Sequence, residues 1–235
     1  MKRSGASQTK AGRAEERLFF GSCIADSMVR SAFGDHQASL SRLKLALALK
    51  PDYAPAILSM GSVEYRRGRN AQGLKLFRSL LSLPLNTPDL WQIVDEAGTF
   101  LIQFGVYKDG LKLYRTAIER FPAAAALHQG LSCCAGHEGA HDEAVAAAER
   151  ALRLEPDNRK LVNDLGWCLF EAGRLEEAVK MLEQAVSKDP SDELARENLR
   201  FCKATAAKPR KKTRRSRAWR STYKLKPVER NRWPS

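Results

Sequence analysis

One short motif in this sequence has the residue types and the spacing of a zinc hydrolase. Residues 137–141 read His-Glu-Gly-Ala-His, which matches the pattern H-E-x-x-H. On one continuous helix, two histidines at this spacing share a face and can bind zinc, while the glutamate takes a proton from metal-bound water. This chemistry therefore requires an unbroken helix through Gly139.

The surrounding sequence favours a polar turn at this motif. Gly139 belongs to a series of regularly spaced glycines at which helices are expected to end, so the two histidines should lie on opposite sides of a turn. A weak adventitious metal site is the alternative, with Cys133 and Cys134 nearby in the sequence. We predict no catalytic residue, no resident metal and no cofactor, and we interpret the chain as non-enzymatic.

The cysteines indicate a reducing compartment. There are five, an odd number, and their spacing is not that of a disulfide framework. No apolar run is long enough for a transmembrane helix, and the first residues lack the apolar region of a secretory signal. We expect a cytoplasmic protein, or a nuclear one in a eukaryote.

The net charge of +13 is concentrated in the C-terminal tail. Residues 203–235 contain 13 Lys and Arg against the single acid Glu229, so the rest of the chain is nearly neutral. Prolines interrupt this segment and its apolar periodicity is lost, which predicts a disordered basic tail over 206–235.

Three interpretations of the tail remain open. The first is a solvated, nonspecific segment. The second is a site for nucleic acid or ribonucleoprotein, in which aromatic rings stack on bases. The third is a contact for an acidic protein, a membrane surface or the chain's own groove. The candidate anion-binding residues are Lys208, Arg210, Lys211, Lys212, Arg214, Arg215, Arg217, Trp219, Arg220 and Tyr223.

Regularly spaced glycines and prolines indicate where the helices of the chain begin and end. Each glycine of the series is followed by a small residue five positions later and, in four of five cases, by a proline seventeen positions later. The glycines are Gly34, Gly68, Gly105, Gly139 and Gly173, and the prolines are Pro51, Pro84, Pro122, Pro156 and Pro190, of which Pro84 comes one residue early. A period near 34 residues is typical of stacked helix pairs.

This combination of glycine, small residues and proline resembles the tetratricopeptide repeat family. The resemblance implies an all-α, right-handed α-solenoid of about five helix pairs, each a helix A followed by a helix B. We assign a disordered lead to residues 1–18, an array to 20–192 and a capping helix to 193–205. The five repeats are 20–53, 54–87, 91–124, 125–158 and 159–192.

The family also implies a function, because its helices A line a groove that holds partner peptides or helices. We therefore expect a protein-interaction scaffold or adaptor, with nucleic-acid association through the tail as the alternative. The candidate groove residues are Leu58, Tyr65, Asp95, Glu96, Thr99, Gln129, Lys160, Asn163, Asp164, Trp167, Phe170 and Glu171.

One subclass of the family binds the acidic C-terminus of chaperones through a clamp of lysine, arginine and asparagine. The corresponding positions here lack those cations: they are Ile24, Met28, Ser59, Gln92 and Glu96. Because two anionic groups need cations to neutralise them, we exclude an acidic C-terminus as the partner. We predict an apolar or basic peptide or helix instead.

Overall fold

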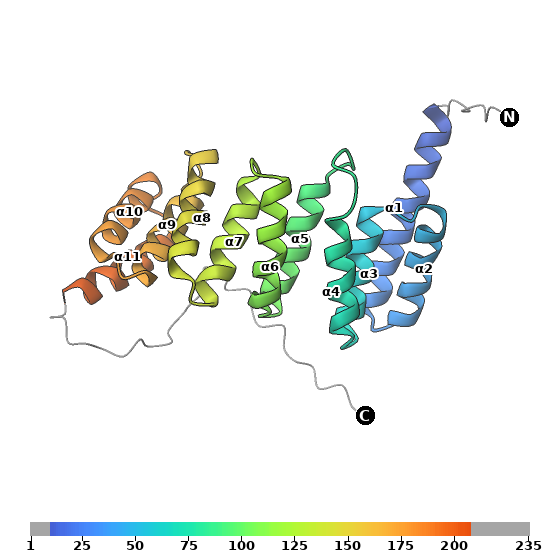
Figure 1. The fold of residues 1–235 in the computed structure, drawn as a ribbon, viewed down its shortest axis with the longest axis horizontal. Helices are drawn as coiled ribbons and strands as arrows, with labels where there is room; N and C mark the ends of the chain where they lie inside the picture. Colours follow the sequence, from blue (N-terminus) through green and yellow to red (C-terminus); the bar gives the residue numbers. More distant parts are fainter. Residues whose placement is uncertain (1–9, 208–235) are drawn as a thin grey trace. The chain divides into compact units, whose positions relative to one another are not determined.

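The computed structural model describes residues 10–207, and every regular element in that range is an α-helix (Figure 1). The helices are α1 (Lys10–Ala32), α2 (His36–Leu49), α3 (Ala54–Arg66), α4 (Asn70–Leu80), α5 (Leu90–Gln103), α6 (Tyr107–Arg120), α7 (Ala125–His137), α8 (His141–Leu154), α9 (Arg159–Glu171), α10 (Leu175–Lys188) and α11 (Glu193–Ala206). The predicted all-α class is confirmed. No helix between residues 10 and 207 is long and apolar enough to span a membrane.

The turn glycines separate the two helices of each pair. All five have positive φ, from 70° at Gly105 to 81° at Gly34, a conformation that side chains with a Cβ rarely adopt. At the end of α7, the N–H of Gly139 donates to the carbonyl of Gly136, and the N–H of Ala140 donates to that of Ala135. The last carbonyls of the helix are thereby satisfied, which fixes the turn.

The helices fall into two compact units that divide α5 between Ala97 and Gly98. Unit 1 contains α1 to α4 and the first part of α5, and unit 2 contains the rest of the described chain.

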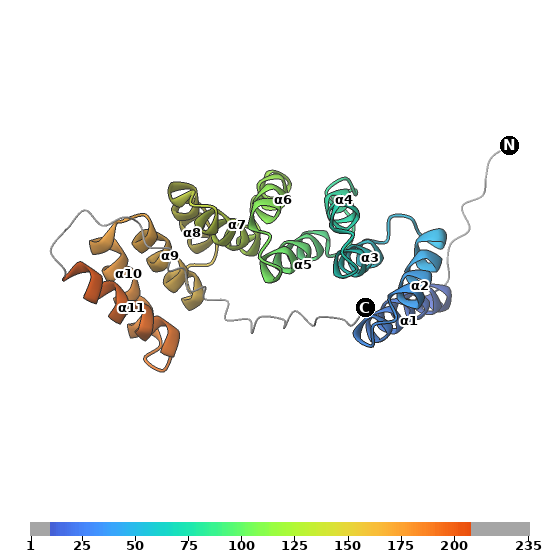
Figure 2. The ribbon, with the colours of Figure 1, turned by 90° about the horizontal axis from the view of Figure 1, so that it is seen from below.

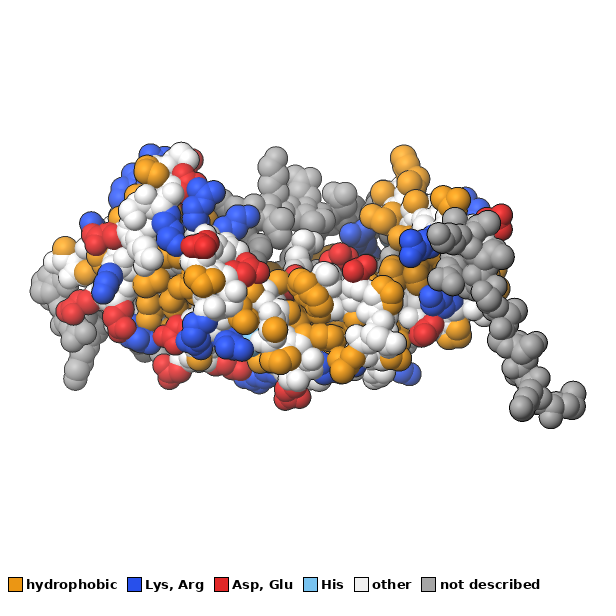
Figure 3. All heavy atoms as spheres, turned by 90° about the horizontal axis from the view of Figure 1, so that it is seen from above, with side chains coloured by type: hydrophobic (Ala, Val, Ile, Leu, Met, Phe, Trp, Pro, Cys, Tyr) orange, Lys and Arg blue, Asp and Glu red, His pale blue; other side chains and the backbone are white. Residues whose placement is uncertain are grey.

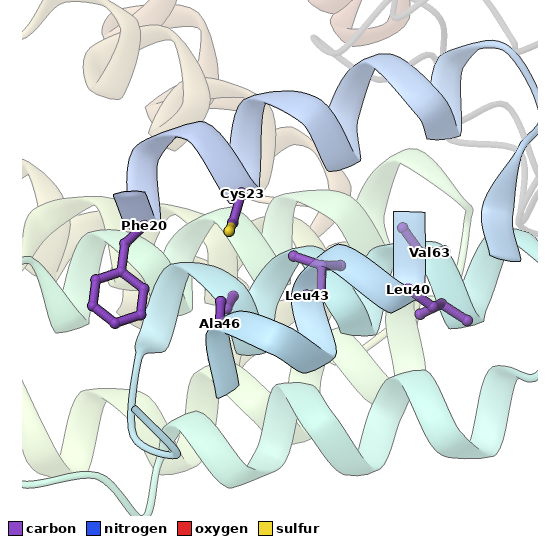
Figure 4. Close-up of a cluster of buried hydrophobic side chains, with 7 residues drawn as sticks. Phe20, Cys23, Leu40, Leu43, Ala46 and Val63 are labelled. Carbon is purple, nitrogen blue, oxygen red and sulfur yellow. The ribbon is translucent and has the colours of Figure 1, made fainter. Parts of the chain in front are cut away.

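Unit 1 is held together by a core between its first three helices. Phe20 and Cys23 of α1 face Leu43 and Ala46 of α2, and Val63 of α3 is buried in the same cluster (Figure 4). Cys23 is thus a small apolar core residue, as its place in an apolar helix suggests.

In unit 2, successive helices stack in chain order from α6 to α11. Each helix packs on the next one, and α7 and α9 also lie side by side. Helices α6 and α8 both lie on one side of the pair formed by α7 and α9 (Figure 2). Close approach depends on small residues. A Cβ atom built on Gly166 of α9 would lie only 2.7 Å from Cγ of Leu182 on α10, so this contact requires glycine.

The predicted disordered lead is wrong for residues 10–18, because α1 begins at Lys10. This stretch is rich in Ala, Glu, Arg and Lys, which are strong helix formers, and Phe20 and Cys23 anchor the following turns in the core. At the other end, α11 extends to Ala206, close to the expected capping helix. Residues 1–9 and 208–235 lie outside the described part.

Candidate partner-binding surface

The centre of the candidate surface is a polar contact between two helices A of unit 2. Nε2 of Gln129 on α7 donates a hydrogen bond of 2.7 Å to Oδ2 of Asp164 on α9. Both side chains are half-buried. Glu171 lies two turns after Asp164 on α9, and Lys160 lies one turn before it and is exposed. We call these four residues the α7–α9 face.

The carboxyl group of Asp164 is held in an unfavourable environment for its charge. Burial raises its pKa to about 6, although hydrogen bonds from Gln129 and Asn163 and the charge of Lys160 act in the opposite direction. Within residues 10–207, no Lys or Arg forms a salt bridge with Asp164. Its negative charge is therefore only partly compensated by the protein.

The cysteines beside this face are unreactive. Burial raises the pKa of the Cys133 thiol far above its usual range, and the nearby charges of Asp164 and Glu171 raise that pKa further. Burial likewise raises the pKa of the Cys134 thiol to about 12. Because the thiolate is the nucleophile and the metal ligand, these thiols stay protonated at neutral pH.

Two predicted groove residues of unit 2 are covered by the last helix. Asn163 is 3% exposed, and its Oδ1 accepts a hydrogen bond of 3.0 Å from Nδ2 of Asn198 on α11. Trp167 is 7% exposed, and its ring centroid lies 6.1 Å from that of Phe201, also on α11. The prediction that these two side chains line an open groove is wrong, because α11 packs over them.

The other predicted residues of unit 2 remain at least partly accessible. Phe170 is half-buried, with its ring 5.2 Å from Trp167 and 5.4 Å from Phe201. Thr99, at the start of unit 2, is half-buried as well. Phe201 itself is 49% exposed and was not among the predicted groove residues. It gives α11 an apolar contribution to the surface beside Phe170.

In unit 1, Tyr65 is also buried between helices. It is 6% exposed, and a Cβ atom built on Gly73 of α4 would lie 3.1 Å from Cβ of Tyr65 on α3. Tyr65 is therefore a packing residue, and the prediction that it lines the groove is wrong. Leu58 and Asp95 are half-buried and Glu96 is exposed, so these three stay accessible within unit 1.

The zinc motif is divided by a turn, as expected. His137 is the last residue of α7 and His141 is the first of α8, with Gly139 at φ 77° between them. The ring of His137 stacks on Tyr107 at 3.4 Å between centroids, and burial lowers the pKa of His137 to about 3. Among residues 10–207, no group of His, Cys, Asp and Glu is arranged to hold a metal.

The predicted anion-binding residues of the tail begin at Lys208 and lie outside the described residues.

Comparison with known sequences identifies the class of protein. Two sequence models of the tetratricopeptide repeat match residues 98–158 and 137–199. Together with the helix pairs and their turn glycines, these matches show that residues 98–199 consist of tetratricopeptide repeats.

Solved structures with a similar fold include two TPR proteins and MamA. TTC0263 of Thermus thermophilus is 21% identical, with a TM-score of 0.50 over 79% of this chain and 99% of that chain. YrrB, described as a TPR protein with an unusual peptide-binding site, is 21% identical, with a TM-score of 0.53 over 81% and 98%. MamA of Desulfovibrio magneticus RS-1 is 16% identical, with a TM-score of 0.54 over 80% and 99%. At these identities the likeness shows the fold alone.

One curated relative is similar in sequence. The CTR9 homolog of Arabidopsis thaliana is 28% identical over 136 residues, which is 57% of this chain. The match spans only 9% of that much longer protein.

Proposed function

We propose that this chain is a non-catalytic adaptor that holds a segment of a protein partner against the α7–α9 face. The observation that carries the proposal is the half-buried carboxylate of Asp164, which is hydrogen-bonded to the neutral Gln129 but has no salt bridge within residues 10–207. A cationic group of a partner would supply the missing charge. The peptide-binding site named for YrrB supports the general mode of action.

The chemistry of this face favours a basic and apolar partner segment. Glu171 adds a second carboxylate on α9, and the half-exposed rings of Phe170 and Phe201 offer apolar contacts. A lysine or arginine of the partner would approach Asp164 while neighbouring apolar side chains contact those rings. An acidic segment would instead meet like charge in a partly desolvated site, which is unfavourable.

Fluorescence anisotropy with labelled peptides tests this proposal. Short peptides of alternating arginine and leucine should bind, and peptides of alternating glutamate and leucine should not. Asp164→Asn keeps an oxygen that can accept the hydrogen bond of Gln129 but removes the charge. We expect it to weaken binding of the basic peptide by roughly tenfold or more, since a hydrogen bond to a charged group contributes about 1.5–3 kcal/mol.

Asp157→Asn is the matched control. Asp157 is exposed in the loop between α8 and α9, so the same chemical change there alters net charge without touching the face. It should leave the affinity within about twofold, as expected for a surface charge far from the ligand. Equal weakening by both substitutions, or equal binding of the acidic peptide, would contradict the proposed site.

A second candidate function, nucleic-acid association through the tail, is motivated by the dense basic run that follows Lys208. Pull-downs of the full chain with and without nuclease separate the two functions. Partners that survive nuclease treatment favour the adaptor, whereas partners that are lost favour the nucleic-acid role.

A further inference from the structure

The outer face of α1 is an uncovered apolar stripe. Leu18, Met28, Val29 and Phe33 are 74%, 64%, 56% and 86% exposed, although each is a large apolar residue. Apolar side chains gather over α1 at the right-hand end of the view in Figure 3. The stripe consists of Leu18, Gly21, Ser22, Ala25, Met28, Val29, Ala32 and Phe33, all of them exposed. Nothing in residues 10–207 covers it, and exposed apolar faces of this length mark interaction sites.

On α7, which is helix A of a later repeat, the corresponding face packs against the preceding helix α6. On α7, a Cβ at Gly130 would lie 2.1 Å from the ring of Tyr114, and Sγ of Cys134 lies 2.8 Å from a Cβ built on Gly110, so both residues face α6. Gly130 and Cys134 precede their turn glycine, Gly139, by nine and five residues. The residues at these two positions before Gly34 are Ala25 and Val29. The stripe is therefore the side of α1 that is shaped to receive another helix.

We propose that a second copy of α1 occupies this stripe, antiparallel to the first and related to it by a two-fold axis at Ala25. In that arrangement three of the four large side chains fall opposite a small residue of the other copy, and Phe33 falls opposite Arg17. Leu18 lies opposite Ala32, Val29 opposite Gly21, and Met28 opposite Ser22. This alternation lets two identical faces interdigitate without overlap.

The charges of the stripe are compatible with self-association. None of its residues is charged, so two copies meet without like-charge repulsion. The acidic group at its edge is satisfied within one chain, because Asp26 pairs with Arg30 at 2.9 Å and with Arg42 at 2.5 Å. An antiparallel pair also places opposite ends of the two helix dipoles side by side.

The size of the contact predicts a weak, closed dimer. Residues 18–33 extend over roughly 22 Å of helix, so the pair buries less than the roughly 800 Å² per partner of a standard interface. The dissociation constant is then on the order of micromolar or weaker. Because the contact uses the same patch on both copies, assembly ends at two chains.

Sedimentation velocity of the full chain, from about 1 µM to about 1 mM, tests the dimer. The parent should change from monomer to dimer across this range. Val29→Glu should keep the helical signal in circular dichroism, because the side chain is exposed in the monomer, but should raise the dissociation constant by more than about tenfold. Leu49→Glu on α2 is the matched control, since Leu49 is 64% exposed but lies outside the stripe, and it should dimerise like the parent.

Paired substitutions test the antiparallel register. Ser22→Glu and Met28→Lys should each weaken self-association, yet a mixture of the two variants should form a mixed dimer in which the new glutamate faces the new lysine. Ala25→Cys should form an intermolecular disulfide at the two-fold axis, whereas Ala48→Cys on α2 should not. The five native cysteines are buried and do not compete.

Three results would overturn the proposal. A parent chain that stays monomeric up to about 1 mM would show that the stripe does not bind a second copy and that its partner is a different protein. Assemblies that grow beyond two chains would indicate head-to-tail contact between α1 and another part of a second copy. A dimer that persists in Val29→Glu, or that forms no disulfide through Ala25→Cys, would place the interface elsewhere.

Discussion

Tyr114 of α6 fills the space that a side chain on Gly130 of α7 would occupy. A Cβ atom built on Gly130 would lie 2.1 Å from Cζ of the Tyr114 ring, and one built on Gly98 of α5 would lie 2.3 Å from the same atom. Tyr114 is fully buried between these two glycines. Consecutive helix pairs of unit 2 thus meet around one aromatic ring at a separation that requires glycine.

Gly130→Ala should therefore destabilise unit 2. The added methyl group forces the Tyr114 ring or the helix backbone to move, which costs about 1–3 kcal/mol of unfolding free energy. Urea denaturation followed by circular dichroism measures the change. Gly21→Ala in α1 is the control with the opposite sign. No atom lies within 4 Å of its new Cβ, so it should stabilise the helix by about 0.5–1 kcal/mol. Losses of equal size in both variants would contradict this account.

The close contacts that Gly98 and Gly130 make with Tyr114 differ in how well the sequence predicts them. Gly98 lies seven residues before its turn glycine, as Gly61 and Gly166 lie seven residues before theirs. Helices A and B of one pair touch at this repeated position, so the close contact of Gly98 was predictable from the sequence. Gly130 contacts a ring from the preceding repeat. That contact depends on which neighbour carries a large aromatic residue, and the local pattern of one repeat does not encode it.

Asp164→Asn should stabilise the protein at neutral pH. The pKa of Asp164 is raised to about 6 in the folded state, above the value near 3.9 expected after unfolding. Between these pH values the folded state holds a proton that the unfolded state has lost, so the unfolding free energy falls as pH rises from about 4 to 6. Because Asp164→Asn cannot ionise, it avoids this fall in unfolding free energy, and it should raise the stability at pH 7 by about 1–3 kcal/mol.

The pH dependence separates this effect from a general change in packing. Denaturant unfolding of the parent and of Asp164→Asn should give a difference that shrinks as pH falls towards about 4, where the folded carboxyl is protonated and the unfolded one is becoming protonated. A difference that is constant between pH 4 and 7 would show that the charge of Asp164 is not destabilising in the fold.

The hydrogen bond between Asn198 and Asn163 should anchor α11. Asn198→Ala leaves the buried amide of Asn163 without this partner, which should cost about 1–3 kcal/mol. Arg196→Ala on the exposed side of α11 is the control and should change stability by less than about 0.5 kcal/mol. Hydrogen exchange should be faster along α11 in the first variant only. Unchanged protection there would show that the pair is dispensable.

The covering of Asn163 and Trp167 by α11 explains where prediction from sequence failed. Turn glycines and prolines determine where helices begin and end, and these are local properties of the chain. Which positions of a helix A stay open depends on the neighbouring helix, and α11 uses Asn198 and Phe201 to cover two of them. The pairing of Gln129 with Asp164 likewise depends on the register between neighbouring repeats.

Zinc should not stabilise this protein. His137 and His141 belong to different helices, and the ring of His137 is stacked on Tyr107. Placing both histidines on one helical face, as the zinc motif requires, would need the turn at Gly139 to be rebuilt as helix. The thermal midpoint of tag-free protein should be the same with added zinc and with a chelator. A chelator-sensitive midpoint, together with one zinc per chain, would show that the motif is a metal site.

His137 should instead control stability in acid. Burial lowers its pKa to about 3, below the value near 6.5 expected in the unfolded chain. Between these pH values the unfolded state binds a proton that the folded state does not, so the unfolding free energy falls as pH falls from about 6.5 to 3. His137→Phe keeps an aromatic ring against Tyr107 and removes the titration. It should lose less stability than the parent between pH 7 and 4, by about 1–2 kcal/mol, because the partly exposed ring is screened by solvent. Parallel stability curves for the two proteins, or an imidazole resonance that titrates near pH 6.5 in the folded parent, would show that His137 is not buried as a neutral ring.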